Sequence, residues 1–294
     1  MPDLSAGNVR FRAWFYAHWG RENCIILGSS KNVEYGKYRQ RLSVKMANGG
    51  GERYFIDNRT LVVDDDSYLV LNDERDYSSV IRAERSVESF SVFFRTGLME
   101  EVMGAMGASI ERVTEPSYAR AVEFPERLQP HDTTVSPVMR FIRHHIRSGV
   151  DDEAWYEEQL HVLAAKLLVQ QRRVRLQTLR LECARPATRI ELCRRLALAA
   201  DFILSNYERD LRLEQMAAAA CLSAHHFMRL FRAVYGVTPT QFLYRKRVQA
   251  ALHLQCRSSL PLQEIASRVG FNSRATFYRQ LRRWQPVVAD NSTP

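Results

Sequence analysis

The sequence lacks any long apolar run. No stretch of its 294 residues approaches the roughly 18 consecutive apolar side chains of a membrane-spanning helix. The first residues also lack the basic and then apolar segments of a secretory signal peptide. We therefore expect a cytoplasmic protein with no membrane partner.

Cysteine is scarce and scattered. The five cysteines are Cys24, Cys183, Cys193, Cys221 and Cys256, and no two have C-x-x-C spacing. An odd and scattered set is typical of thiols in a reducing compartment, and it forms neither a disulfide framework nor a zinc site.

Histidine is missing between His18 and His131. Imidazole and carboxylate are the usual ligands of a metal held inside a β-barrel, so this gap excludes such a metalloenzyme. The adjacent His144 and His145 point to different faces of a helix and make a poor metal site. G-x-S-x-G and phosphate-binding glycine loops are missing as well. The sequence therefore predicts no enzyme, no metal and no cofactor.

Positive charge is present but unevenly placed. The formal net charge is +9, and residues 186–294 alone carry 16 Lys and Arg against 7 Asp and Glu. The first 185 residues carry 26 of each sign. A localised basic region is typical of a domain that binds a polyanion such as nucleic acid, whereas a solubilising surface would not be segregated in this way.

Short β-rich runs occupy the chain from about residue 20 to residue 95. Arg41–Met46 and Val87–Phe93 alternate apolar and polar residues with the period of a half-buried strand. Turn-forming clusters separate the runs, and Gly49–Gly51 is most simply a hairpin turn. The spacing predicts a small sandwich or barrel. The remaining runs are Arg53–Ile56, Leu61–Val63 and Tyr68–Leu71.

Helical patterns follow the strands. Thr96–Met106 is one predicted helix, and Ser136 with Pro137 supplies an N-cap and first-turn proline for another that ends at Arg147. A third helix runs from Asp151 to about Arg173 with leucines at helical spacing. Such a stripe faces either the core or a second subunit, and the sequence leaves both open. The segment Arg185–Thr188, with its proline, is the predicted domain boundary.

One pattern occurs twice near the C-terminus. The first copy comprises Leu213–Ala217, a turn at Leu222–Ser223, and Phe227–Arg232. The second copy repeats it 49 residues later before the turn and 50 residues later after it. Each copy has the form of a helix-turn-helix, and two copies predict a protein that reads duplex DNA at two places. The matching segments of the second copy are Leu262–Ala266, Gly270–Ser273 and Phe277–Arg282.

Aromatic and aliphatic anchors orient each second helix. We expect Phe227 and Phe231 to face inward in the first copy, and Phe277 and Leu281 in the second. The neighbouring side chains then face DNA, where arginine can hold guanine in a bidentate contact. The candidates are His225, Met228, Arg229, Arg232, Arg274, Ala275, Thr276 and Arg279.

Caps divide the rest of the segment. Ser223 is the predicted N-cap of the first reading helix, and Gly236 ends it. Thr238 and Pro239 start a long helix to about Gln255, which holds the two reading helices roughly one DNA turn, about 34 Å, apart. The alternative to a DNA-binding domain is a small helical bundle whose arginines lie on a solvent-exposed surface.

On these residues, the segment from about 190 to 284 resembles the DNA-binding domain of AraC/XylS-type transcription regulators. The resemblance is carried further by Gly236–Pro239, Phe242, Arg245 and Val269–Phe271. It implies a seven-helix domain with two helix-turn-helix units. It also implies base contacts from His225, Met228 and Arg229 in the first unit, and from Arg274, Ala275, Thr276 and Arg279 in the second.

The N-terminal region resembles the cupin-like effector domain of the same family, in which helices serve dimerisation. This implies that Val135–Arg173 is a partner-facing helix pair. Tyrosines and arginines of the β-rich region would bind an aromatic or carboxylate effector, or they are ordinary strand residues. The candidate effector-binding residues are Arg39, Arg41, Arg53, Tyr54 and Tyr68.

The chain departs from the family pattern at its end. Members usually carry a second Gly-x-x-Pro-x-x-Tyr/Phe-Arg segment, the counterpart of Gly236–Arg245, but here the sequence after Trp284 is different. The second reading helix would then lose packing behind it. The alternative function is therefore a dimerisation or interaction protein that binds no DNA because its second helix-turn-helix is defective.

Together these features predict an α+β multidomain protein. Residues 1–130 form a cupin-like β-barrel sensor, residues 131–185 a helical dimerisation segment and linker, and residues 186–294 an all-α domain with two helix-turn-helix motifs. The predicted function is sequence-specific transcription regulation controlled by a small-molecule effector. The implied partners are promoter DNA, RNA polymerase, the effector and a second copy of the chain.

Overall fold

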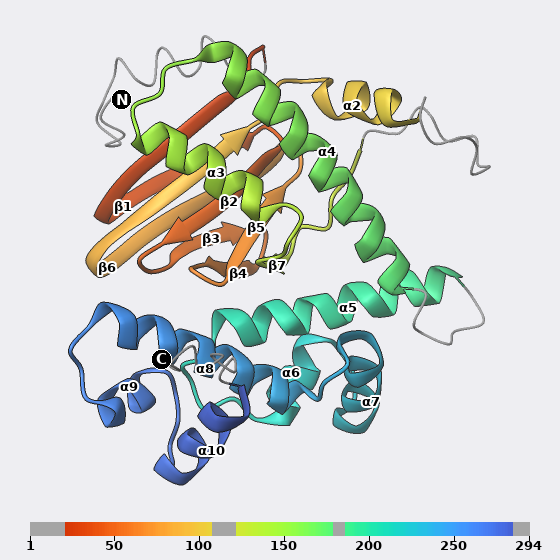
Figure 1. The fold of residues 1–294 in the computed structure, drawn as a ribbon. Coiled ribbons are helices and arrows are strands. Elements are labelled where there is room, and N and C mark those ends of the chain that lie inside the picture. The colour runs from red at the N-terminus through yellow and green to blue at the C-terminus, as the bar shows by residue number, and fades with distance from the viewer. Residues whose placement is uncertain (1–20, 108–121, 179–185, 285–294) are drawn as a thin grey trace, which may run out of the picture. The chain divides into compact units, whose positions relative to one another are not determined.

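The chain folds into two compact units, Met1–Gln177 and Thr178–Pro294. The computed structural model describes residues 21–107, 122–178 and 186–284, shown as a coloured ribbon in Figure 1. No helix within these ranges is long and apolar enough to cross a membrane. The predicted division at residues 130 and 185 stays a prediction.

The N-terminal unit contains one antiparallel sheet of seven strands. The long strand β6 is its centre, because β1 pairs with it from Cys24 opposite Phe93 to Gln40 opposite Arg75. The same stretches of β6 also pair with β2 and β3, so these two strands share its other edge. The strands are β1 (Cys24–Gln40), β2 (Ser43–Asn48), β3 (Glu52–Ile56), β4 (Arg59–Val63), β5 (Ser67–Leu71), β6 (Arg75–Phe93) and β7 (Leu128–Pro130).

The sheet curls into a nearly closed barrel. Strand β5 pairs with β2 and β7, and β4 pairs with β3 and also contacts β5 and β7. The predicted antiparallel barrel is therefore confirmed. The predicted hairpin turn at Gly49–Gly51 is wrong, because β2 and β3 pair with β6 and not with each other. Gly49 has φ of +86° in this connection, a conformation that glycine adopts without strain.

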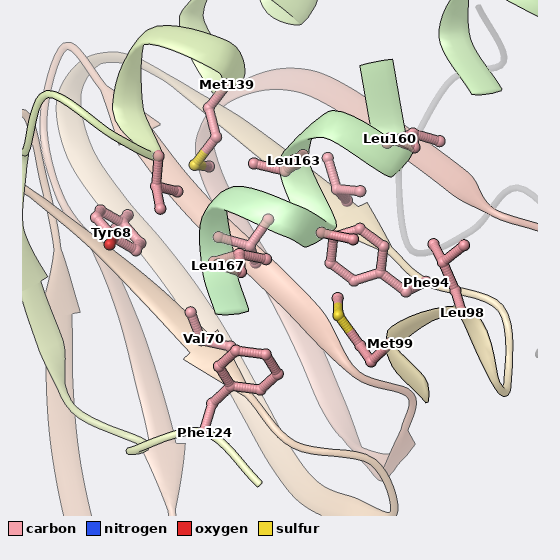
Figure 2. Packing of buried hydrophobic residues seen from close by; sticks show 14 of the residues in the cluster. Tyr68, Val70, Phe94, Leu98, Met99, Phe124, Met139, Leu160, Leu163 and Leu167 are labelled. Atoms are coloured by element: carbon pink, nitrogen blue, oxygen red, sulfur yellow. The ribbon is translucent and has the colours of Figure 1, made fainter. Parts of the chain in front are cut away.

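Three helices cover one face of the barrel: α2 (Leu98–Gly107), α3 (Ser136–Arg147) and α4 (Glu153–Thr178). Val44, Met46 and Val70 point from the strands into the same buried cluster as the leucines of α4. Figure 2 shows Leu160, Leu163 and Leu167 of α4 among side chains from the strands and from α2 and α3. The leucine stripe therefore packs into the core, which is one of the two alternatives left open by the sequence.

The start of α3 is fixed by Asp132. Its Oδ1 accepts hydrogen bonds from the backbone N–H groups of Thr134 (2.7 Å) and Val135 (2.6 Å). Its Oδ2 accepts one from the hydroxyl of Tyr68 on β5 (2.8 Å). The expectation that Ser136 caps this helix is wrong, because Val135 is the N-cap residue and makes no side-chain cap. The Ser136 hydroxyl is instead buried and accepts from the backbone N–H of Asp132 (3.1 Å).

Replacing Asp132 with alanine should lower the free energy of unfolding by about 1–2 kcal/mol. The change removes the acceptor for the first turn of α3 and leaves the hydroxyl of the buried Tyr68 without that partner. Urea unfolding of the full chain measures the effect. Asp151→Ala, at an exposed carboxylate nearby in the chain, is the control and should change the stability little.

Helices are the regular secondary structure of the C-terminal unit within its described residues. Predicted and observed helix ends agree closely, because the caps are local. The Ser223 hydroxyl accepts from the His226 N–H (3.4 Å), and Gly236 ends the helix with φ of +75°. Thr238 and Gln241 form a reciprocal capping box at the start of α8, with Pro239 in its first turn. The helices are α5 (Pro186–Ser205), α6 (Leu213–Ala219), α7 (Ala224–Tyr235), α8 (Pro239–Arg257), α9 (Leu262–Arg268) and α10 (Arg274–Trp284).

Candidate nucleic-acid interface

Helix α7 presents one apolar and one basic side. Phe227 and Phe231 are fully buried, with their rings 5.2 Å apart, among residues of α5 and α6. His225, Arg229 and Arg232 are exposed, and Met228 keeps 39% of its surface accessible. The structure therefore places all four predicted DNA-facing residues of this helix on the outside.

Helix α10 repeats this arrangement. Phe277 is buried against Phe271, with the ring centroids 5.2 Å apart. The Ser273 hydroxyl caps the helix by accepting from the Thr276 N–H (3.4 Å). Leu281 is half-buried, as are Thr276 and Trp284, whereas the other predicted DNA-facing residues are exposed. These exposed residues are Arg274, Ala275 and Arg279.

The second helix pair, α9 and α10, has a core of its own against α8. Val248 and Ala251 of α8 pack with Ile265 of α9 and with Phe277. Trp284 packs at the edge of this cluster and donates from Nε1 to Gln280 (3.1 Å). The second pair is therefore supported from within the described residues. The altered segment after Trp284 lies outside them.

A loop between α5 and α6 joins the two helix pairs. Tyr207 packs against the core around Phe227 and also against the core around Phe277. Arg247 of α8 is buried and donates to two carbonyl oxygens of this loop, Tyr207 O and Arg209 O, both at 2.7 Å. Burial lowers the pKa of this guanidinium. Gly270 lies so close to the loop that an added Cβ would be 2.7 Å from Glu208 O.

The candidate arginines differ electrostatically from other arginines of the unit. Arg194 and Arg195 pair with Glu191, and Arg268 pairs with Glu264 on its own helix. Among the described residues, no carboxylate forms an ion pair with the outward arginines of α7 and α10, which are Arg229, Arg232, Arg274, Arg279 and Arg282. Unpaired exposed guanidinium groups are available to phosphate oxygens or base edges.

The predicted effector residues do not meet at one place. Arg41 pairs with Asp73 (3.4 Å), and Tyr68 lies on the helix-covered face with its hydroxyl bound to Asp132. On β3, Tyr54 is buried whereas Arg53 is exposed, so they point to opposite faces of the strand. The side chain of Arg39 lies outside the described residues.

Sequence reasoning missed the polar residues inside the barrel. Lys45 and Glu52 are both almost fully buried. Apolar and polar residues alternate along Arg41–Met46, but the polar residues of this run were expected to face water. No group of three or more His, Cys, Asp or Glu residues within the described ranges is arranged to hold a metal ion.

Comparisons with known proteins place the C-terminal unit in a family. Residues 216–287 match the family described as a helix-turn-helix domain. The probable transcriptional regulator LumQ of Photobacterium leiognathi is 28% identical over 88 residues, which cover 30% of this chain and 36% of that protein. The transcriptional activator RclR of Escherichia coli is 37% identical over 71 residues, 24% of this chain and 25% of that one. The matched part thus spans about a third or less of these relatives.

Solved structures were also compared. A ToxT variant from Vibrio cholerae aligns with 89% of this chain and 93% of that one, at 11% identity and a TM-score of 0.39. The DNA-binding domain of AdpA, solved with a target DNA, is 32% identical over 31% of this chain and 81% of that one, with a TM-score of 0.30. By its sequence matches, the C-terminal part of the chain is similar to the helix-turn-helix domain of AraC-type transcription regulators.

Proposed function

We propose that this protein is a sequence-specific DNA-binding transcription regulator that inserts α7 and α10 into the major groove. The observation that carries the proposal is the matched pair of helices, each with a buried phenylalanine and an outward set of unpaired arginines. Arg229 and Arg279 follow their anchors Phe227 and Phe277 by the same two residues. Both arginines therefore point to the side on which a recognition helix contacts bases.

The connecting helix suits a protein that occupies two successive grooves. Helix α8 has 19 residues, and at 1.5 Å per residue it is about 28 Å long. Successive major grooves on one side of DNA repeat about every 34 Å. A single chain would then contact two adjacent grooves through His225, Met228, Arg229 and Arg232 on one helix and Arg274, Ala275, Thr276 and Arg279 on the other.

The N-terminal unit is proposed to control this binding as a homodimer in the cytoplasm. Its barrel would take a small-molecule effector, and Tyr54 is the predicted effector residue that faces the interior. An aromatic group on α3 and α4 supports a partner surface, because Phe141 is 47% exposed and the His145 ring stacks on Trp155 at 4.2 Å. RNA polymerase would be a further partner at the promoter.

Selection of binding sites from random duplexes tests the proposal. The full chain should enrich a sequence that contains two half-sites about one helical turn apart. The alternative protein that binds no DNA is less well supported, because the second helix pair keeps a buried core. A lack of any enriched sequence, even at low salt, would falsify the regulator function.

Arg229→Ala should weaken binding to the selected site about 10- to 100-fold, which corresponds to about 1–3 kcal/mol. If Arg229 contacts one base pair, the variant should no longer distinguish the bases at that position. Changing that base pair should then lower the affinity of the variant little further. Gel-shift titrations on single-base variants of the site measure this. Arg279→Ala should act in the same way at the other half-site. Arg194→Ala, at an arginine paired with Glu191, is the control and should bind normally. A uniform loss across all sequences would show that Arg229 contacts phosphate instead.

A further inference from the structure

The interior of the barrel contains buried polar groups among apolar side chains. On β2, Val44 and Met46 pack against the helices, so Ser43 and Lys45 point to the opposite face, inside the barrel. Lys45 lies opposite Ser91 of β6 and Leu69 of β5, and these three side chains share that face. Strand β3 adds Glu52 and Tyr54 to it. The strands thus place a lysine and a glutamate in an interior that also holds Ile56, Leu61 and Leu69.

Two opposite charges lie in this interior without forming an ion pair. Lys45 and Glu52 are each only 2% exposed. The Lys45 ammonium lies 3.6 Å from the ring centroid of Phe93 and 5.3 Å from that of Tyr77. The ammonium therefore lies over two aromatic faces. Burial lowers the pKa of Lys45, and the negative charge of Glu52 opposes that change.

Two interior oxygen atoms have no partner. Burial and the neighbouring Glu52 raise the pKa of the Tyr54 hydroxyl. Within the described chain, Glu52 Oε2 and Ser43 Oγ are buried and lack any hydrogen bond. An unsatisfied buried acceptor costs about 1–3 kcal/mol, and more when it is charged. A set of such atoms around two unpaired charges is expected where a ligand supplies the missing contacts.

We propose that the barrel interior binds a small zwitterion of the α-amino-acid class, with its carboxylate on Lys45 and its ammonium on Glu52. The interior pair is neutral in sum, so a zwitterion satisfies both charges and leaves none unbalanced. A simple anion would pair with Lys45 and repel Glu52. An uncharged polyol would leave both charges with neutral hydrogen bonds only. Tyr54, Tyr77 and Phe93 would contact the side chain of the ligand.

The proposal of a binding site depends only on the residues of the barrel. The proposal that its ligand regulates DNA binding rests on the proposed function. The two are tested separately. Amino-acid binding without any DNA binding would support the proposed binding site and contradict the proposed regulatory function. Sequence-specific DNA binding without amino-acid binding would support the proposed regulatory function and contradict the proposed binding site.

The test titrates the full chain with each proteinogenic L-amino acid by calorimetry and thermal unfolding. At least one should bind and raise the melting temperature, whereas acetate, methylamine and mannitol should not. Glu52→Gln and Lys45→Met should each weaken that binding about 10-fold or more. Glu34→Gln, at an exposed glutamate paired with Arg82, is the control and should bind as the wild type does.

The double variant Lys45→Met with Glu52→Gln is a control for the single variants, whose loss of binding could result from misfolding around one unpaired buried charge. It removes both charges together, so its barrel should unfold at or above the wild-type temperature while binding no amino acid. The proposal is overturned if no amino acid binds at about 10 mM, a concentration that would still shift the stability for a millimolar site. It is equally overturned if acetate or methylamine binds as well as the amino acid, or if the double variant still binds.

Discussion

Gly270→Ala is expected to lower the free energy of unfolding of the C-terminal unit by about 3 kcal/mol or more. Gly270 has φ of +89° in the turn between α9 and α10, where an L-residue is strained. The added Cβ would also lie 2.7 Å from Glu208 O and 2.9 Å from Tyr207 O. Both obstacles are backbone atoms of the α5–α6 loop, so a rotamer change cannot relieve the overlap. The loop or the second helix pair must move.

Gly236→Ala is the matched control for this prediction. Gly236 also has a positive φ, +75°, but an added Cβ there would meet no atom within 4 Å. It should therefore show the conformational cost alone, about 1 kcal/mol. Denaturant unfolding followed by the circular dichroism of the helices measures both variants. Equal losses for the two variants would mean that the close approach between Gly270 and the loop contributes nothing.

The sequence predicted the C-terminal unit well because its determinants are local. Ser223, Thr238 and Gly236 act on backbone groups within four residues, so their roles can be identified without the fold. The inward direction of Phe227 and Phe277 follows from helical periodicity alone. Arg247 shows where local reasoning ends. Its partners are the carbonyl oxygens of Tyr207 and Arg209, about 40 residues earlier.

The N-terminal unit was predicted less completely, since its strands depend on distant pairing. Strand β1 lies in the region predicted as β-rich, but its bounds were not predicted, because register shifts between Ser30 and Asn32 and between Tyr35 and Tyr38 interrupt the alternation. Alternation also cannot tell which side of a strand is outside. Lys45 was expected in water, but helices cover the apolar side of β2 and leave the polar side in the barrel. The interior charges therefore became visible only in the structure.

The two helix pairs form one continuous structure through the α5–α6 loop. The side chain of Tyr207 reaches both cores, and Arg247 holds the backbone on either side of Glu208. Gly270 brings the second turn against the same loop. A regulator that reads two grooves with one chain needs a fixed spacing between its reading helices. Arg247 is accordingly a positioning residue in the proposed function, although its side chain is buried.

Arg247→Ala is expected to lower the free energy of unfolding by about 2–4 kcal/mol, because two charge-assisted hydrogen bonds and the packing of the side-chain stem are lost. Relief of the desolvated guanidinium offsets part of this loss, but the two carbonyl oxygens lose their partner. Affinity for a two-half-site duplex should fall further than affinity for a single half-site, since the two reading helices no longer hold one spacing. Denaturant unfolding and gel-shift titrations on both duplexes measure these effects.

Arg245→Ala is the control, two residues earlier on the same helix. The Arg245 side chain is exposed, with its guanidinium 5.9 Å from the Trp284 ring centroid. Its loss should cost about 1 kcal/mol or less, and the ratio of the two affinities should stay at the wild-type value. A purely structural role for Arg247 would weaken both duplexes by the same factor. Only a role in setting the spacing between α7 and α10 predicts a selective loss on the two-half-site duplex.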